Sequence, residues 1–437
     1  MKLMDLAEAT LDRAKRGGAA QVAVSAARNR GVEVAFRDGK LEKLSESTSA
    51  SLGVALFVEG RYSSHSTSDL RPEALATFVE RAISLTRLLG EDKYRGLADP
   101  KLYAGRPKDD LQLYDPSFAK LTTERRKEMA EQVEAAARSV KAPIASVNAE
   151  YSDAVGESVR LHSNGFSGGH QRSSAWVGAT VTMNDSDGRK PAEWHWVGAR
   201  HLQELPDLAA VGREAAERAQ RRLGQKKLPS GKLPIVVDNR TAKALLGHLL
   251  SPLYGSALQQ KRSFLLDQKG KRIASRLLTL VDEPLLAKGF GSRHFDSDGI
   301  SAKKRTLLEA GVLREYLIDV YYARKLGVEP TGGSTSNLVL QPGKRSQAQM
   351  IQGIQRGVLV TGMIGGNSDV TRGDFSHGIF GFEIRDGKLG GPVGEMNISG
   401  NHRELWKRLV EVGNDPYPYT TMLTPSLRFE KVSLSGS

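Results

Sequence analysis

The chain of 437 residues is too long for one ordinary hydrophobic core, so its length predicts two folded domains. With 39% hydrophobic and 26% charged residues it resembles an average globular protein, and no apolar run approaches the roughly 20 residues that a membrane-spanning helix needs. The complete lack of cysteine excludes disulfides, thiolate catalysis and cysteine metal ligands. We expect no membrane partner. The acidic, amphipathic first segment does not read as a signal peptide, which favours a cytoplasmic location.

The net charge of +13 is compatible with nucleic-acid binding or with an ordinary basic surface. The positive residues are spread along the chain. Their densest runs, residues 221–227 and 303–305, lie at the expected ends of elements, where solvated lysine and arginine are common. The sequence contains no helix-turn-helix, zinc-finger or aromatic–basic stacking pattern. We therefore expect no nucleic-acid partner.

The N-terminal half, residues 1–227, is predicted to be one α+β domain. Alternation of apolar and polar residues predicts antiparallel strands in two regions, 21–67 and 144–199. Turns are expected at residues 28–31, 37–39 and 59–60. Helical periodicity and capping residues, among them Thr122 or Thr123, predict helices at residues 4–17, 72–89, 122–140 and 206–223. Strands with so few crossover helices between them favour antiparallel sheets flanked by helices.

The C-terminal half, residues 228–437, is glycine-rich and is predicted to be a second α+β domain. A short buried strand at Ile235–Val237 precedes an amphipathic helix that Asp238 or Asn239 can cap. Hairpin turns are expected at residues 310–311 and 386–387. Further strands are expected at residues 277–282, 338–340, 357–364 and 426–434, and further helices at residues 321–326, 347–354 and 403–410.

The helix after Asp238 is where a zinc protease could carry two histidines one turn apart with a glutamate beside the first. This segment has only His248, followed by Pro252, and proline has no ligand atom. The nine histidines of the chain include no close-spaced pair on one expected element. The sequence therefore predicts no metal-ligating residue and no resident cofactor in this chain.

Two other patterns invite a catalytic or phosphate-binding interpretation. Asp374, Ser376 and His377 contain the residue types of a serine triad, but neighbours in one strand cannot converge, and no GxSxG elbow is present. The glycines between residues 365 and 378 match neither a Walker A motif nor GxGxxG, so they read as turn residues. We predict no catalytic residue in this chain.

Several longer stretches, in the same order, are similar to one known family. They are GHLLSPLYGSALQQKRSFLLD (Gly247–Asp267), KGFGSRHFDSDGI (Lys288–Ile300), YYARKLG (Tyr321–Gly327) and the block Asp369–Asp415. Together they resemble the TldD/PmbA family, also called the modulator of DNA gyrase family. Within it, the chain looks most like the TldE/PmbA member of the TldD–TldE pair.

The resemblance implies a role without chemistry of its own. In the TldD subunit the helix carries HExxxH; aligned on it, Gly247 and Pro252 stand at the two histidine positions and His248 at the glutamate. This implies a metal-free subunit of a zinc-dependent peptidase that degrades or processes unfolded peptides, with the zinc in the partner. A heterodimer with a TldD-like subunit is implied, and a homodimer stays open. Polar positions in the matched motifs make His248, Arg372 and His377 the candidate peptide-cavity residues.

Two alternatives remain open from the residues alone. One is an independent metallopeptidase with an unrecognised metal site. The other is a non-enzymatic binding protein for nucleic acid or protein, which only the basic charge favours.

Overall fold

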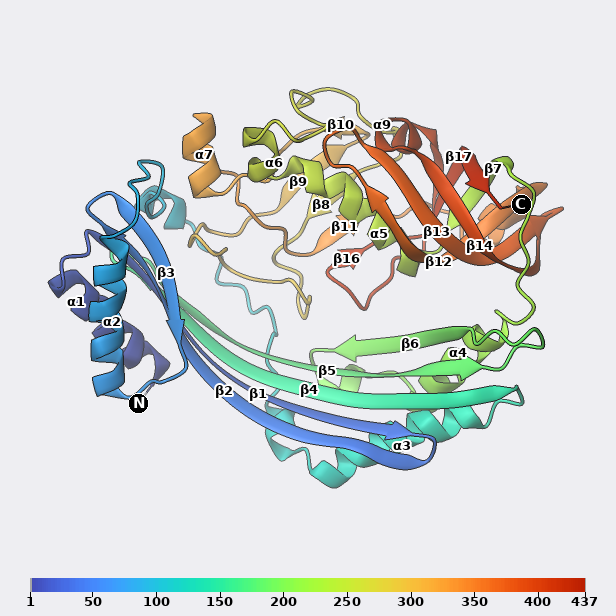
Figure 1. Cartoon of the computed structure of the whole chain (residues 1–437), viewed down its shortest axis with the longest axis horizontal. Helices are drawn as coiled ribbons and strands as arrows, with labels where there is room; N and C mark the ends of the chain where they lie inside the picture. Colours follow the sequence, from blue (N-terminus) through green and yellow to red (C-terminus); the bar gives the residue numbers. More distant parts are fainter. Residues whose placement is uncertain (1, 437) are drawn as a thin grey trace.

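The computed structural model describes residues 2–436 and places a long curved sheet opposite a more irregular body (Figure 1). The curved sheet comes from the N-terminal half, and the second body comes from the C-terminal half. The chain passes from one to the other after residue 220, and the boundary predicted near residue 228 lies in this connection. The concave face of the sheet is turned toward the C-terminal body.

The N-terminal sheet is antiparallel throughout, with strand order β3-β2-β1-β4-β5-β6. Its strands are β1 (Gln21–Arg37), β2 (Lys40–Val58), β3 (Arg61–Thr67), β4 (Ile144–His162), β5 (Ser167–Met183) and β6 (Ala192–Ala199). The helices on its convex face are α1 (Leu3–Arg16), α2 (Pro72–Thr86), α3 (Thr123–Arg138) and α4 (Leu208–Gln220). Because one face of each strand packs on these helices, the strands alternate between buried and accessible residues.

The two faces of the sheet differ in chemistry. On β1, Val22, Val24 and Val34 are fully buried on the helix side. The opposite, concave side carries small residues: Ser25 on β1 lies opposite Gly53 on β2. Cross-strand partners point to the same face, so the concave face is floored mainly by serine, alanine and glycine. Such a floor leaves room for another molecule.

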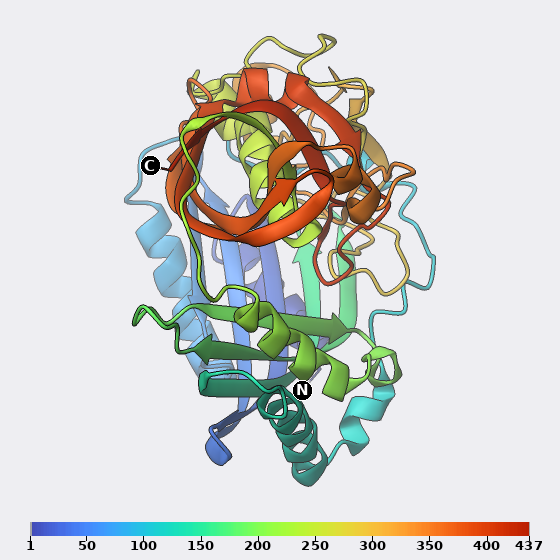
Figure 2. The same ribbon diagram turned by 90° about the vertical axis from the view of Figure 1, so that its right-hand side faces the viewer.

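The C-terminal half contains a closed barrel and a small sheet. The barrel strands follow the order β14-β13-β12-β7-β17-β15, and β14 also pairs with β17, which closes the ring seen in Figure 2. They are β7 (Gly231–Val237), β12 (Arg356–Ser368), β13 (Asp374–Arg385), β14 (Lys388–Asn401), β15 (Leu409–Val412) and β17 (Leu427–Ser435). The small sheet contains β8 (Leu280–Asp282), β9 (Arg305–Glu309), β10 (Val312–Leu313), β11 (Leu338–Leu340) and β16 (Met422–Leu423).

Short helices connect these strands: α5 (Asn239–Leu250), α6 (Gly255–Gln259), α7 (Val320–Leu326), α8 (Gln347–Gln352) and α9 (His402–Leu405). Asp238 caps α5 by accepting a hydrogen bond from the backbone N–H of Arg240, at 3.0 Å. The apolar face of α5, including Leu245, Leu246 and Leu249, packs into the main core cluster with the barrel strands. None of the helices within residues 2–436 is long and apolar enough to cross a lipid bilayer.

The predicted α+β class, with antiparallel sheets flanked by helices, is confirmed, although β7 and β12 pair in parallel. Two local predictions are wrong. No turn forms at residues 28–31, because β1 continues through them and pairs with β2 on one side and β4 on the other. The helix predicted at residues 403–410 ends at Leu405, and Leu409–Val412 instead forms β15 against β17.

Candidate functional site

Three histidines from separate elements meet beside α5. The ring of His248, on α5, stacks on that of His377, on β13, with centroids 4.8 Å apart and planes at 19°. His402, at the start of α9, lies 5.6 Å from His248. Phe375 contacts both His377 and His402, at 5.7 and 4.8 Å, and Phe264 stacks on His402 at 5.9 Å. The histidine cluster is therefore packed among aromatic rings.

Burial controls the charge of this cluster. Burial is the main cause that lowers the pKa of each of the three histidine rings. For His402, burial and then repulsion from His248 and His377 lower the pKa to about 3. The three imidazoles are therefore neutral at pH 7. His402 Nε2 shares a hydrogen bond of 2.8 Å with Ser368 Oγ. Among the described residues, His377 Nε2 and His402 Nδ1 are buried and lack a hydrogen-bond partner.

The histidine cluster does not fit a zinc ion. Ligand lone pairs lie in the plane of an imidazole ring, so the nearly parallel rings of His248 and His377 direct theirs side by side and not toward one point. The Nε2 atom of His402 is already engaged by Ser368. Within residues 2–436 no group of three or more histidines, aspartates or glutamates is arranged to hold a metal ion.

The structure brings two of the three candidate peptide-cavity residues together. His248 and His377 are in contact, whereas the Arg372 side chain is 78% exposed and pairs with Asp369, with Nε and Oδ2 3.1 Å apart. His402 was not a candidate in the sequence. Its position depends on α5, β13 and α9 meeting in space, and no local spacing signals that meeting. The assignment of these residues to a peptide cavity stays a prediction.

A groove lies on the concave face of the N-terminal sheet, where a loop of the C-terminal body, residues 293–298, reaches it. Cavities of about 430 and 310 Å³ share the lining residues Ser25, Gly53, Arg160 and Ser297, so they are neighbours on the same face. The larger is also lined by three further serines and a histidine from the sheet: Ser51, Ser66, Ser158 and His170. The groove is lined by residues of both halves of the chain.

The loop that walls the groove is held by its own hydrogen bonds. Asp296 Oδ1 accepts bonds from the backbone N–H groups of Asp298 and Ile300, at 2.9 and 3.0 Å. Phe295 packs edge-on against Phe166, in the turn between β4 and β5, with centroids 5.0 Å apart. Burial, followed by the charge of Asp296, raises the pKa of Asp298 to about 6. The loop therefore presents fixed carboxyl and aromatic groups next to the sheet.

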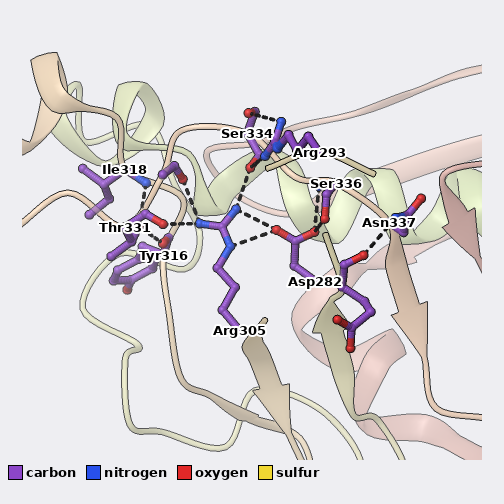
Figure 3. Close-up of polar contacts among 11 residues, drawn as sticks. Asp282, Arg293, Arg305, Tyr316, Ile318, Thr331, Ser334, Ser336 and Asn337 are labelled. Atoms are coloured by element: carbon purple, nitrogen blue, oxygen red, sulfur yellow. Dashed lines mark hydrogen bonds and ion pairs between the residues drawn. The ribbon is translucent and has the colours of Figure 1, made fainter. Parts of the chain in front are cut away.

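A buried ion-pair network anchors the other side of this loop (Figure 3). Arg305 pairs with Asp282 at 2.9 Å and donates a further hydrogen bond to the backbone carbonyl of Ser334. Arg293 donates to the same residue, at 2.9 Å to Oγ and 2.7 Å to the carbonyl oxygen. Asp282 in turn accepts bonds from the backbone and hydroxyl of Ser336. The network links β8, β9 and the segment before β11 behind the groove.

Comparison with known proteins decides the family. Residues 230–436 match the PmbA/TldA metallopeptidase C-terminal domain, residues 116–223 its central domain and residues 22–86 its domain 1. The protein named metalloprotease PmbA of Escherichia coli O157:H7 is 30% identical, covering 95% of this chain and 92% of that protein. The chain belongs to the PmbA/TldD family. The resemblance found in the sequence is thereby confirmed.

Other relatives in the PmbA/TldD family agree. A metalloprotease PmbA homolog of Haemophilus influenzae is 28% identical over 97% of this chain and 93% of its own length. A crystal structure from Bacteroides thetaiotaomicron, described as a modulator of DNA gyrase, is 40% identical, with a TM-score of 0.97 and 99% of both chains covered. TldE from Thermococcus kodakarensis shares the fold, with a TM-score of 0.84 at 22% identity, covering 99% of this chain and 100% of that one.

Proposed function

We propose that this chain is the metal-free, TldE/PmbA-like subunit of a zinc-dependent peptidase complex that degrades or processes unfolded peptides. In this role it forms one wall of the substrate cavity and supports a partner that carries HExxxH. The partner is a TldD-like subunit in a heterodimer; a homodimer is the competing assembly. A cytoplasmic location is part of the same proposal.

The observation that carries this proposal is the side-chain set of α5. At the positions where the family resemblance puts the two zinc-binding histidines, this helix has Gly247 and the adjoining turn has Pro252, and neither side chain offers a ligand atom. His248, at the position of the general base, is stacked on His377 with a lowered pKa. Zinc bound in the partner would supply the activated water for hydrolysis.

The concave face supports the part of the proposal that concerns peptides. Its floor of small polar residues and the adjoining groove leave backbone-sized space beside the sheet. A folded domain is too wide for cavities of about 430 and 310 Å³, whereas an extended segment of a few residues can enter them. The chain would thus act on peptide by binding and orienting it, and the cleaving groups would come from the partner.

The test is zinc content and peptidase activity of the purified chain, alone and mixed with a HExxxH-bearing partner, with an unstructured peptide as substrate. We expect neither stoichiometric zinc nor cleavage from the lone chain, and cleavage from the mixture. A partner whose HExxxH glutamate is replaced by glutamine is the matched control and should abolish cleavage. Stoichiometric zinc with chelator-sensitive cleavage by the lone chain would overturn the proposal in favour of an independent metallopeptidase.

A further inference from the structure

Four arginines gather where the loop of the C-terminal body meets the concave face of the sheet. Each donates to uncharged oxygens: Arg160 to the carbonyl of Ser297, Arg172 to that of Ser292, Arg200 to those of Ser173 and Phe290, and Arg293 to Ser334. Within residues 2–436, none of the four guanidinium groups lies within 4.0 Å of a carboxylate oxygen. Their positive charges are therefore hydrogen-bonded but not neutralised in a direct ion pair.

The buried environment makes this arrangement costly without an anion. Burial is the first cause that lowers the pKa of each of these arginines, and for Arg200, next to Arg172, the value falls to about 10. The Nε atoms of Arg172 and Arg200 are buried and have no hydrogen-bond partner in the described chain. A buried cation favours the approach of a negative group.

Two of these arginines reach the larger cavity of the groove. Arg160 and Arg293 line it together with His170 and Ser158, whose Nε2 and Oγ atoms lie 3.0 Å apart. Burial and then the charge of Arg172 hold the pKa of His170 at about 4, so its ring stays neutral and does not add a titrating charge at pH 7. The cavity thus offers guanidinium and hydroxyl donors, which is the donor set that a carboxylate accepts.

Asp296 of the same loop lines the larger cavity and Asp298 the smaller one, but both carboxylates already accept hydrogen bonds from backbone N–H groups. Asp296 is directed to backbone N–H groups of its own loop, and Asp298 Oδ2 accepts from the backbone N–H of Val320 at 3.1 Å. The pKa of Asp298 is raised to about 6, so its negative charge is lost as the pH falls through this value. The charges of Asp296 and Asp298 act on Arg160, and those of Asp296 and Asp282 act on Arg293, while Asp282 is already paired with Arg305. Three aspartates thus offset the four arginines only in part, and the local balance stays positive.

We propose that the groove contains a carboxylate-binding subsite, centred on Arg160 and Arg293 with Ser158, that selects acidic peptide segments. The carboxylate comes from a glutamate or aspartate side chain or from the C-terminus of the peptide. This inference rests on the proposed function in that it names the class of peptide that the groove accepts. Arg160 is a binding residue here, because one of its donors holds Ser297 and the others remain for the ligand.

The test is fluorescence anisotropy of the purified full chain with a short, unstructured, labelled peptide of glycine, serine and glutamate. A second peptide has its glutamates replaced by glutamine, and a third keeps them but has an amidated C-terminus. We expect the glutamate peptide with a free C-terminus to bind about tenfold or more tightly than whichever peptide lacks the recognised carboxylate. Loss with glutamine identifies a side-chain carboxylate, and loss with the amide identifies the C-terminus.

Variants separate the subsite from general attraction to a basic protein. Arg160→Gln should remove the preference, and Arg160→Lys should retain part of it. The matched control, Arg28→Gln, removes one positive charge from β1 on the opposite face and should leave the preference unchanged. Equal binding of all three peptides, no binding of any, or an equal loss with Arg28→Gln would overturn the proposal.

These outcomes do not depend on cleavage. If Arg160→Gln does not fold, the discrimination among the three peptides by the unmodified chain still decides the matter. If the chain prefers the acidic peptide but its mixture with the partner does not cleave, the proposed function is wrong and the subsite stands. If the mixture cleaves peptide but the chain shows no preference for the acidic peptide, the subsite is wrong and the proposed function stands.

Discussion

Replacing Asp282 by asparagine should destabilise the C-terminal body strongly. The Asp282 and Arg305 side chains are 3% and 8% exposed, and the carboxylate accepts Arg305 Nε at 2.9 Å and the backbone N–H of Ser336 at 2.7 Å (Figure 3). Asp282→Asn leaves a buried guanidinium without its counter-charge and turns an amide NH₂ toward donors. Breaking such a pair from one side costs about 3–5 kcal/mol. Because Arg305 keeps its carbonyl acceptors, including Gly332, we expect about 3 kcal/mol.

The measurement is the free energy of unfolding in urea, followed by tryptophan fluorescence and by circular dichroism. The matched control is Asp369→Asn, which weakens the exposed pair with Arg372 and should cost far less, because solvent screens that pair. The double variant Asp282→Leu with Arg305→Met removes both charges and should recover part of the loss. A cost for Asp282→Asn no larger than that of the control would refute the reasoning.

Three further outcomes follow from the packing. The folded state holds the pKa of His402 at about 3 against 6.5 in the free side chain, so the unfolded state binds more protons between these values. The contribution of neutral His402 to stability is then fully present above about pH 6.5 and is lost as the pH drops. The unfolding midpoint of His402→Phe should therefore fall less steeply with decreasing pH than that of the unmodified chain. Gly212→Ala on α4 places a Cβ 2.1 Å from the carbonyl oxygen of Val133 on α3 and should cost about 1–3 kcal/mol. At Gly247 on α5 an added Cβ meets nothing within 4 Å, so Gly247→Ala should stabilise the folded state by about 0.5–1 kcal/mol. Urea unfolding should therefore show opposite changes in the free energy of unfolding for Gly212→Ala and Gly247→Ala.

Features with short-range causes were predictable from the sequence. Thr122 and Asp238 cap their helices as expected, because each accepts a backbone N–H two or three residues ahead. The hairpin turn at residues 310–311 has φ of 46° and 78°, and the turn at residues 386–387 has φ of 49° and 74°, which Ala-Gly and Asp-Gly pairs can adopt. In both cases the residues that specify the element are the residues that form it.

The two wrong predictions have long-range causes. Gly31 reads as a turn residue, but it is paired with Ser47 on one side and Ala154 on the other, and these ladders extend β1 to 17 residues. The predicted helix at residues 403–410 included Leu409, yet Leu409–Val412 lies against β17 and takes the strand conformation of its neighbour. Tertiary pairing overrides local preference at both places.

The histidine cluster shows why the site was only partly predictable. His248 and His377 stood out because they lie in motifs of the PmbA/TldD family, not because any spacing relates them. Their contact, and that of His402, depends on the barrel, which brings α5 next to β13 and α9, more than a hundred residues later in the chain. Arg372 was selected on the same grounds, but its loop directs the side chain to Asp369 and solvent.

The arginines of the groove combine two tasks that lysine could not combine. A guanidinium has five donors in a rigid plane, so Arg160 can hold the carbonyl of Ser297 with one edge and keep another for a ligand. The contact that positions the loop of the C-terminal body is then also the contact that presents the positive charge to the cavity. Arg160→Lys should therefore weaken both carboxylate discrimination and thermal stability, whereas a purely electrostatic role would leave discrimination intact. A joint loss of discrimination and stability in Arg160→Lys would thus support the double role of this guanidinium.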